Sequence, residues 1–390
     1  MSYMGMGDIT RDDFSIIDCM FDVFIPQHSE IWLFGTGAYS EAFDSYLQEC
    51  GVAVVGFVTS KPDYKSFRKR PVVSIEQFKN HYSCEIGLLL TISNRFYNEI
   101  LPLLSFMQKE DILEIKELHK QSAFDRCGNR QTVPLLAFHI ADSCSLSCYG
   151  CTAASPIIKD GGLYDIDNFK TDISRYKEIY TEVDEINFTG GDVFYNPCFP
   201  DFLCEARRLY PNSKVSFSTN GIELVCKDDS FWDILRENKI FVYWTLYPIR
   251  YKGYEKTVQK AKELDINLVV MGDTLGEDKN SWRVPFSEDP ISKQYDFLLC
   301  RYHRRCAVTI DGILYPCCAM RQIKHLNEAF YTQIALRDGD SIDIHKSSAV
   351  EIQEFLKKRP PLCDYCAIRE RRNMNKWLPS RGKKEEWILD

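Results

Sequence analysis

The alternation of apolar runs with amphipathic stretches predicts two α/β segments along the chain. In the first, short apolar runs fall at residues 31–34, 52–58 and 86–91, and residues 40–49 repeat apolar side chains at helical spacing. Short apolar runs between turn residues are typical of buried strands, and strands that alternate with helices form parallel sheets. A small Rossmann-like α/β domain is therefore expected over residues 1–125.

The alternation resumes after residues 121–132, whose polar and aperiodic sequence predicts a linker. A parallel sheet or barrel is expected over residues 133–290, and its functional residues should lie where the strands end. The expected strands are residues 135–140, 185–190, 214–219, 240–246 and 266–271, with helices between them that include 166–180 and 254–264.

The first segment carries a Gly-x-Gly turn that invites comparison with dinucleotide-binding domains. The turn runs from Gly35 to Ser40, so its third small residue is serine, and the second strand leads into Thr59-Ser60-Lys61 without an acidic residue to hold a ribose. NAD binding and a dehydrogenase function are therefore disfavoured. This segment looks similar to amino-terminal domains of sugar-modifying enzymes, and a phosphate-bearing ligand at the helix start stays open beside a structural or docking role.

Composition narrows the function classes. A formal net charge of −8 offers no overall positive field, so nucleic acid is not an expected partner. No apolar run approaches the roughly 20 residues of a membrane span, and residues 1–13 do not resemble a signal peptide. A cytoplasmic protein is expected, in which the 16 cysteines serve as metal ligands and buried thiols rather than disulfides.

Three of these cysteines form the most specific motif in the chain. Cys144, Cys148 and Cys151 follow the first expected strand of the second segment in a C-x3-C-x2-C pattern. Three thiolates can hold a 4Fe-4S cube while leaving one iron without a protein ligand. A structural zinc knuckle is the alternative, although zinc sites usually close with four ligands and favour paired C-x2-C motifs.

This triplet after the first strand resembles the radical SAM superfamily. The resemblance implies a partial (β/α)6 barrel of the TIM type, in which S-adenosylmethionine chelates the open iron. It further implies reductive cleavage to a 5′-deoxyadenosyl radical that abstracts a hydrogen atom from the substrate. The family often has an aromatic residue directly before the third cysteine; here that position is Gly150, and Tyr149, one place earlier, is the candidate for contact with the adenine.

Later strand ends supply further motifs of the same family in the same order. Gly190-Gly191-Asp192 resembles the Gly-Gly-Glu that grips the methionine amino group, with a shorter acid. Thr219-Asn220-Gly221 resembles a motif near the ribose and carboxylate of S-adenosylmethionine, and Ser218 shares a strand face with Asn220. Arg250, after the fourth strand, could pair with a carboxylate. The expected cofactor-binding residues are Tyr149, Gly190, Gly191, Asp192, Ser218, Asn220 and Arg250.

Residues 291–390 resemble the auxiliary-cluster region of SPASM and twitch relatives. Cys300, Gly312 and Cys317 have the spacing of that region, and a β-hairpin with a type I′ turn is expected at residues 307–315. No cysteine follows Cys366, so one auxiliary cluster of twitch type is expected. A zinc ribbon is the alternative. The expected ligands of a second 4Fe-4S cluster are Cys300, Cys317, Cys363 and Cys366.

The resemblance implies an oxidoreductase-type enzyme that modifies a small molecule. His139 and Tyr247, near expected strand ends, are candidate bases, and Cys306 is a candidate hydrogen donor. A carbohydrate or sugar-linked metabolite, oxidised or epimerised, is the favoured substrate, and a ribosomal peptide is the alternative. The basic segment 369–384 could receive an electron donor such as flavodoxin or ferredoxin. The competing non-enzymatic hypothesis is a zinc-bound scaffold.

Overall fold

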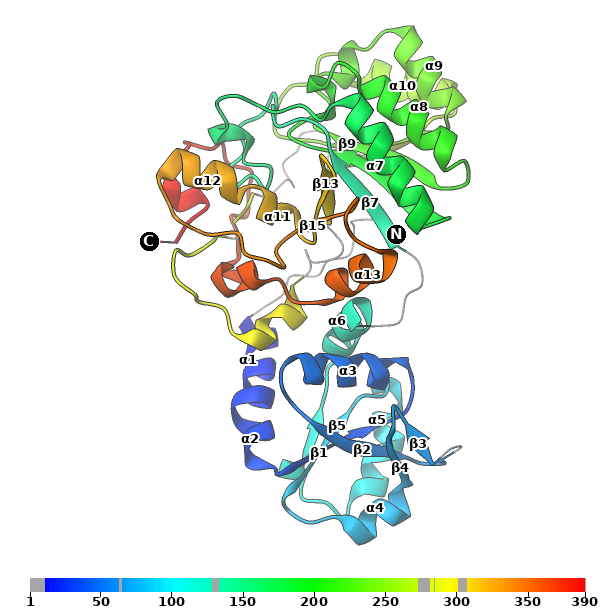
Figure 1. The fold of residues 1–390 in the computed structure, drawn as a ribbon, viewed down its shortest axis with the longest axis vertical. Helices are drawn as coiled ribbons and strands as arrows, with labels where there is room; N and C mark the ends of the chain where they lie inside the picture. The colour runs from blue at the N-terminus through cyan, green and yellow to red at the C-terminus, as the bar shows by residue number, and fades with distance from the viewer. Residues whose placement is uncertain are drawn as a thin grey trace. The chain divides into compact units, whose positions relative to one another are not determined.

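A computed structural model describes residues 11–62, 65–127, 133–272, 281–283, 285–300 and 307–389 (Figure 1). The chain divides into two compact units, and each contains its own sheet. Unit 1 combines residues 1–130 with 293–301, and unit 2 combines residues 131–292 with 302–390. The fold is thus mixed α/β with two sheets rich in parallel strands, as the alternating pattern predicts.

Unit 1 is built on a six-stranded sheet in the order β3-β4-β2-β1-β5-β6. Every neighbouring pair is parallel except β3 with β4, which is antiparallel. The three predicted strands of this segment correspond to β1, β2 and β5. The strands are β1 (Glu30–Phe34), β2 (Val54–Thr59), β3 (Ser66–Phe67), β4 (Arg70–Ser74), β5 (Ile86–Leu90) and β6 (Ile112–Glu114).

The helices of unit 1 bury apolar side chains against this sheet. Trp32, Val58 and Leu88 of the strands pack with Phe78 and Leu104 in one core cluster. The helix after the Gly-x-Gly turn is present and ends at Glu49 as predicted. The helices are α1 (Arg11–Asp18), α2 (Ile25–Gln27), α3 (Ala38–Glu49), α4 (Ile75–His81), α5 (Tyr97–Ile100) and α6 (Glu117–Cys127), with a π-helical segment at Cys19–Phe24 and 3-10 segments at Asn94–Phe96, Leu101–Leu104, Lys109–Asp111 and Gln294–Leu299.

The linker predicted at residues 121–132 is wrong over its first half, because α6 continues to Cys127. Packing against α3 explains the helix: the Tyr39 hydroxyl donates to Gln121 Oε1 at 2.9 Å, and the Tyr39 and Phe124 rings meet edge to face at 6.0 Å. Ala123 is fully buried. The polar sequence of this stretch conceals a helix whose stability comes from tertiary contacts, which periodicity alone does not reveal.

His119, on the same helix, makes the stability of unit 1 depend on pH. Its side chain is buried, and burial lowers the pKa of His119 to about 4, although the carboxylate of Asp13 opposes this shift. Because the folded pKa lies below the unfolded value near 6.5, the neutral ring stabilises the fold above pH 6.5, and this contribution is lost as the pH falls towards 4. We expect His119→Phe to reduce the loss of unfolding free energy between pH 7 and pH 4 by roughly 2 kcal/mol. Urea unfolding at both pH values measures this difference.

His81→Phe is the matched control, because the His81 side chain is about half exposed beside Glu30. An unchanged pH dependence in His119→Phe, with His81→Phe also unchanged, would contradict the assignment.

Unit 2 is built on an eight-stranded sheet in the order β11-β10-β9-β8-β7-β13-β14-β15. Strands β7 to β11 follow one another in parallel, close to their five predicted positions. Closure of these strands into a partial barrel stays a prediction. The strands are β7 (Val133–His139), β8 (Val183–Thr189), β9 (Lys214–Thr219), β10 (Phe241–Thr245), β11 (Asn267–Met271), β13 (Val308–Ile310), β14 (Ile313–Tyr315) and β15 (Ile342–Asp343), with a separate pair β12 (Trp282–Arg283) and β16 (Arg372–Asn373).

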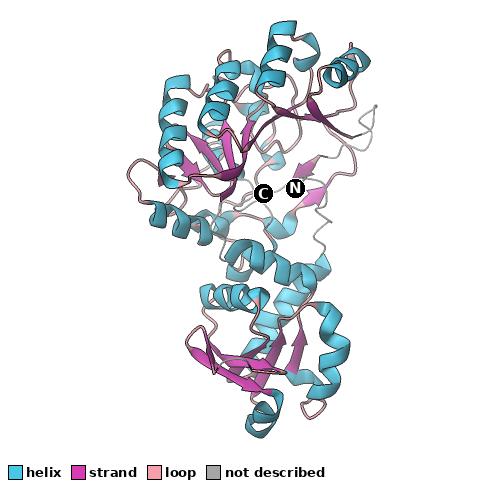
Figure 2. Cartoon of the chain, turned by 90° about the vertical axis from the view of Figure 1, so that its right-hand side faces the viewer, coloured by secondary structure: helices cyan, strands magenta, loops and turns pink. Residues whose placement is uncertain are grey.

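Amphipathic helices cover one face of strands β7 to β11 (Figures 1 and 2). The alternate residues Ile186, Phe188, Val215, Phe217 and Val242 form the buried side of this contact. No helix in the described part of the chain is both long and apolar enough to cross a membrane. The helices are α7 (Ile166–Ile179), α8 (Phe199–Leu209), α9 (Asp229–Glu237), α10 (Tyr254–Glu263), α11 (Cys318–Arg321), α12 (Ile323–Phe330) and α13 (Ala349–Lys357), with 3-10 segments at Ser155–Ile157, Val193–Tyr195, Leu224–Cys226, Pro361–Tyr365, Ile368–Glu370 and Lys384–Glu386.

The predicted hairpin is confirmed: β13 and β14 are antiparallel and joined at Asp311 and Gly312. Both turn residues have positive φ, 47° and 74°, which is the backbone conformation of a type I′ turn. Strand β13 also pairs in parallel with β7 through Val308 opposite Ala137. The hairpin therefore extends the sheet on the side of β7 opposite to β8.

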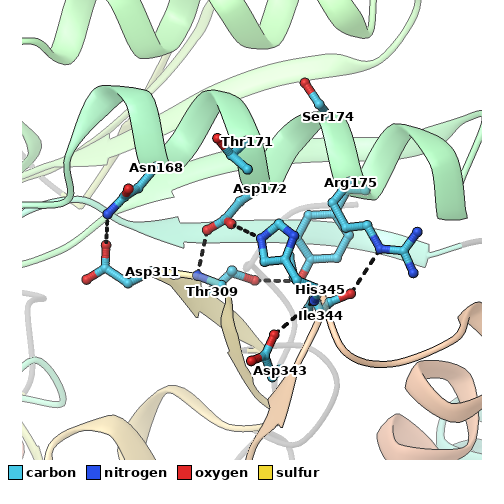
Figure 3. Close-up of polar contacts among 12 residues, drawn as sticks. Asn168, Thr171, Asp172, Ser174, Arg175, Thr309, Asp311, Asp343, Ile344 and His345 are labelled. Atoms are coloured by element: carbon cyan, nitrogen blue, oxygen red, sulfur yellow. Dashed lines mark hydrogen bonds and ion pairs between the residues drawn. The ribbon is translucent and has the colours of Figure 1, made fainter.

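A buried aspartate fastens this hairpin to α7 (Figure 3). Asp172 accepts hydrogen bonds from the Gly312 backbone amide at 2.6 Å and from the Tyr164 hydroxyl, and it lies 2.5 Å from His345 Nε2. Arg175, on the same helix, donates to the Ile344 carbonyl at 3.0 Å. These bonds fix the segment that leads from β15 into the C-terminal region.

Candidate functional site

The cysteine triplet lies in a loop that leaves the C-terminal end of β7. The loop turns back on itself through a hydrogen bond from the Asp142 amide to Gly162 and one from the Ser155 hydroxyl to the Asp142 carbonyl at 2.6 Å. Gly150 has φ of +61°, a conformation that glycine adopts readily, just before Cys151. The strand end and the loop's own hydrogen bonds thus position the cysteines.

The three sulfurs share one neighbourhood. Burial raises the pKa of the Cys144 thiol to about 12, and negative charge on Asp192, Cys151 or Cys148 would raise it further. Burial also raises the pKa of Cys151, although backbone amides at Ala153, Ser155 and Ala154 oppose the shift. The thiols of Cys144 and Cys151 are therefore protonated at neutral pH, and a bound cation would supply the positive charge needed to ionise them.

Hydrogen-bond donors face these sulfurs. The Leu146 amide lies 3.4 Å and Asn220 Nδ2 lies 3.5 Å from Cys144 Sγ, and Trp377 Nε1 lies 3.3 Å from Cys148 Sγ. In iron–sulfur proteins, N–H groups commonly face the ligand sulfurs and tune the reduction potential of the cluster. Within the described ranges, no three His, Cys, Asp or Glu side chains are arranged to hold a metal ion. The case for a cluster at this site therefore rests on the type of side chain present, namely cysteine thiols that face N–H groups.

The glycine pair after β8 packs against the backbone at the start of the cysteine loop. A side chain on Gly190 would come within 2.4 Å of the Ala141 carbonyl oxygen, and one on Gly191 would come within 2.4 Å of the Ser143 carbonyl oxygen. The Gly191 amide donates to that Ala141 carbonyl at 2.8 Å. Both glycines are required because the backbone of β8's end and the start of the loop are in direct contact.

Asp192 is directed towards the next strand. Its side chain is almost fully buried, and it accepts from Thr219 Oγ1 at 2.8 Å, the Asn220 amide at 3.0 Å and the Phe194 amide at 3.2 Å. Burial raises the pKa of Asp192, and the Thr219 and Asn220 bonds oppose the rise. Oδ2 accepts both bonds from the end of β9, and Oδ1 accepts the bond from Phe194. The contact with the methionine amino group expected for Asp192 stays a prediction.

Asn220, directly after β9, lies in contact with the cysteine loop. Its amide nitrogen lies 3.0 Å from Ser145 Oγ as well as 3.5 Å from Cys144 Sγ. Gly221 follows with φ of +81°, and a side chain there would overlap the Trp244 ring. Ser218 is half-buried and lies opposite Tyr243 in the strand register. The Thr-Asn-Gly motif therefore packs against the cysteine loop at Cys144 and Ser145.

The other predicted cofactor contacts are placed less closely. Tyr149 belongs to the loop itself, and its amide donates to the Leu378 carbonyl at 2.9 Å. Arg250 is exposed on the segment after β10.

Tyr247, predicted as a base, is half-buried, and its pKa lies well above 10 because of burial and the neighbouring Cys148 and Cys151. A phenol with a raised pKa stays protonated, which suits a hydrogen-bond donor better than the base expected for Tyr247.

A buried ion pair is formed at the start of the cysteine loop. Arg321 Nη2 is 2.8 Å from Asp142 Oδ1, and His139 Nε2 is also 2.8 Å from that oxygen. Burial and the Arg321 charge lower the pKa of His139 to about 4, so the ring is neutral at pH 7. Burial alone would raise the pKa of Asp142, but His139 and Arg321 together hold it well below its usual value. His325 completes the group, with Nε2 3.9 Å from Asp142 Oδ2.

Three of the four predicted auxiliary ligands pack against the same apolar cluster. Cys317, Cys363 and Cys366 all pack against one apolar cluster formed by Phe286, Met320, Ile323, Leu326, Ile334, Leu362, Trp387 and Ile388, as does Cys151 of the triplet. The hydrogen bond with Cys318, followed by burial, raises the pKa of Cys317 well above 9. Cys300 belongs by its contacts to unit 1, and Cys306 lies outside the described residues.

Sequence reasoning missed Asp142, Arg321 and Trp377. Asp142 follows His139 at a spacing of three, which a search for polar residues around the triplet could have noticed. Arg321 and Trp377 carry no local signal, because their contacts join positions far apart in the chain. Only the folded arrangement identifies them.

Comparisons with known proteins give distant structural likenesses. No family model matches the sequence, and no curated protein matches it significantly. BtrN in complex with AdoMet and 2-DOIA aligns at 14% identity over 66% of this chain and 98% of that chain, with a TM-score of 0.40. The peptide complex of anSMEcpe with bound AdoMet aligns at 20% identity over 35% of this chain and 41% of that chain, with a TM-score of 0.28.

Streptococcus suis SuiB bound to S-adenosylmethionine aligns at 14% identity over 45% of this chain and 44% of that chain, with a TM-score of 0.28. The chain thus spans less than half the length of anSMEcpe and of SuiB. All three TM-scores lie below 0.5, so these likenesses establish neither the fold nor the activity of this chain.

Proposed function

We propose that this protein is a radical SAM enzyme that uses a 4Fe-4S cluster held by Cys144, Cys148 and Cys151. One observation carries the proposal: three thiols of a single strand-end loop share a neighbourhood, and N–H donors from Asn220 and Trp377 face their sulfurs. Such a cluster, when bound, supplies the electron that cleaves S-adenosylmethionine. The three thiols leave one iron of a cube for that cofactor.

The residues around the loop have distinct tasks in this proposal. Gly190 and Gly191 let the backbone after β8 approach the loop closely. Asn220 holds the loop at Cys144 and Ser145. Tyr247, a protonated phenol near the sulfurs, is available as a hydrogen-bond donor and helps to exclude water. His139, neutral at pH 7, is the candidate to accept a substrate proton.

A second 4Fe-4S cluster held by Cys317, Cys363 and Cys366, with Cys300 as the fourth ligand, is part of the proposal. Support for three of these ligands comes from their packing on one apolar cluster, which also touches Cys151. A fully ligated cluster at that place would accept an electron, which makes net oxidation the favoured reaction. Flavodoxin or ferredoxin is the proposed electron donor, and a reducing cytoplasm is the proposed location.

The favoured substrate is a carbohydrate or sugar-linked metabolite, because the α/β unit 1 is unlike a peptide clamp. Anaerobic reconstitution with iron and sulfide, followed by dithionite and S-adenosylmethionine, should give 5′-deoxyadenosine and methionine. Sugar nucleotides should stimulate this release more than short peptides do. Bound zinc without any cleavage would instead support the scaffold hypothesis, and stimulation by peptides alone would overturn the sugar assignment.

A further inference from the structure

The last residues of the chain fold back onto the cysteine loop. Residues 374–389, which we call the C-terminal strap, follow β16 and are drawn in red in Figure 1. The Tyr149 amide donates to the Leu378 carbonyl at 2.9 Å, and the Ser380 amide donates to the Ser147 carbonyl at 2.9 Å. Pro379 lies opposite Cys148 in this antiparallel contact. The strap thus pairs by its backbone with the middle of the triplet.

Two tryptophans of the strap add side-chain bonds to the same loop. Trp377 Nε1 lies 3.3 Å from Cys148 Sγ, and Trp387 Nε1 donates to the Cys151 carbonyl at 2.9 Å. An indole N–H is a donor only, so each ring is oriented by the atom it faces. The Tyr247 ring meets the Trp377 ring edge to face at 6.1 Å, which further fixes the orientation of Trp377.

The strap is also anchored away from the loop. The Leu378 amide donates to Ser281 Oγ at 2.9 Å, and the Phe286 amide donates to the Trp387 carbonyl at 2.7 Å. Trp387 and Ile388 are almost fully buried in the apolar cluster that also contacts Cys151. These independent anchors allow the strap to hold the loop in place, because the strap does not depend on the loop alone for its position.

We propose that Trp377 is a positioning residue of the cluster site, which closes the cysteine loop through Cys148 and makes the bound cluster easier to reduce. The closure of the loop by Trp377 does not depend on a bound cluster. The effect on reduction rests on the proposed function, because a donor N–H at a ligand sulfur stabilises the added negative charge of a reduced cluster. Trp387 donates to a carbonyl oxygen and not to a sulfur. It should therefore help to close the cysteine loop but have no effect on the reduction of the cluster.

The closure is tested in the metal-free full-length protein by hydrogen exchange. Trp377→Phe, and replacement of Trp377 by benzothienylalanine, which keeps the ring shape but lacks the N–H, should speed exchange at the amides of Tyr149 and Ser380. A rise of about threefold to tenfold is expected for one lost net hydrogen bond. Tyr331→Phe is the control, because Tyr331 is 91% exposed and should leave exchange unchanged. Wild-type exchange in both Trp377 variants would overturn the closure.

The effect on reduction is tested in the reconstituted protein by potentiometric titration followed by electron paramagnetic resonance. The benzothienylalanine variant should have a more negative potential for the cluster held by the triplet, whereas Trp387→Phe should keep the wild-type potential while its loop exchanges faster. Equal potentials in wild type and the benzothienylalanine variant would overturn this part. If wild type assembles no cluster, the proposed function fails, and the exchange experiment still decides whether the strap closes the loop.

Discussion

Cys148→Ala is expected to abolish S-adenosylmethionine cleavage in the reconstituted protein. Cys148 is the middle member of the triplet, and its sulfur receives the Trp377 N–H. Two remaining thiols cannot hold a cube, and in the proposed function it is this cube that passes the electron to S-adenosylmethionine. We expect 5′-deoxyadenosine release to fall by about a thousandfold or more, to the background level. The measurement is chromatographic quantification of 5′-deoxyadenosine after anaerobic reaction with dithionite, together with iron analysis.

Cys226→Ala is the matched control for this experiment. Cys226 is exposed and lies in a short 3-10 segment after β9, away from the triplet in sequence. It should keep wild-type iron content and cleavage. Equal cleavage in Cys148→Ala and wild type would show that the triplet is not the site, whatever metal the protein contains.

Arg321→Met is expected to give the second large effect, on stability. Arg321, Asp142 and His139 are all buried, and removal of the guanidinium leaves the Asp142 carboxylate without its charge partner. Breaking a buried ion pair by removing one member typically costs 3–5 kcal/mol, so we expect the free energy of unfolding to fall by roughly 3 kcal/mol at pH 7. Urea unfolding of the metal-free protein, followed by circular dichroism, measures this loss.

The loss should depend on pH in a definite direction. The folded pKa of Asp142 lies below its unfolded value, so its contribution to stability is present above about pH 4 and is lost as the pH falls through the folded pKa. In Arg321→Met the orphaned carboxylate can take up a proton, so the difference from wild type should shrink as the pH falls from 7 towards 4. Arg236→Met, at an exposed pair with Asp233, should change stability by less than about 0.5 kcal/mol. A similar loss in both variants would contradict the role of the buried pair.

The sequence allowed good prediction of the elements and of the loop that gathers the candidate site. Strand positions follow from apolar runs because burial on a sheet face leaves a local signature, and the hairpin follows from Asp311-Gly312 because only few residues adopt its turn. The α6 helix was missed because its stability comes from contacts with Tyr39 across unit 1. Local patterns predict local structure and say little about such distant contacts.

The same limit applies within the site. The strand-end rule placed Gly190, Gly191 and Asn220 near the triplet, and the structure has them there. It could not say that Asp192 would bond to Thr219, since the direction of a short side chain is set by whichever donors lie within reach. Nor could it find Trp377, whose partner Cys148 lies in a different part of the chain.

The placement of β13 beside β7 affects how the protein can fold during synthesis. Strand β7 ends at His139, whereas its neighbour β13 begins only at Val308. Until that later strand leaves the ribosome, one edge of β7 has unpaired backbone groups, and exposed edges of this kind invite pairing with other chains. We therefore expect the nascent chain to depend on chaperones, and production at low temperature with slow translation should increase the yield of correctly folded protein.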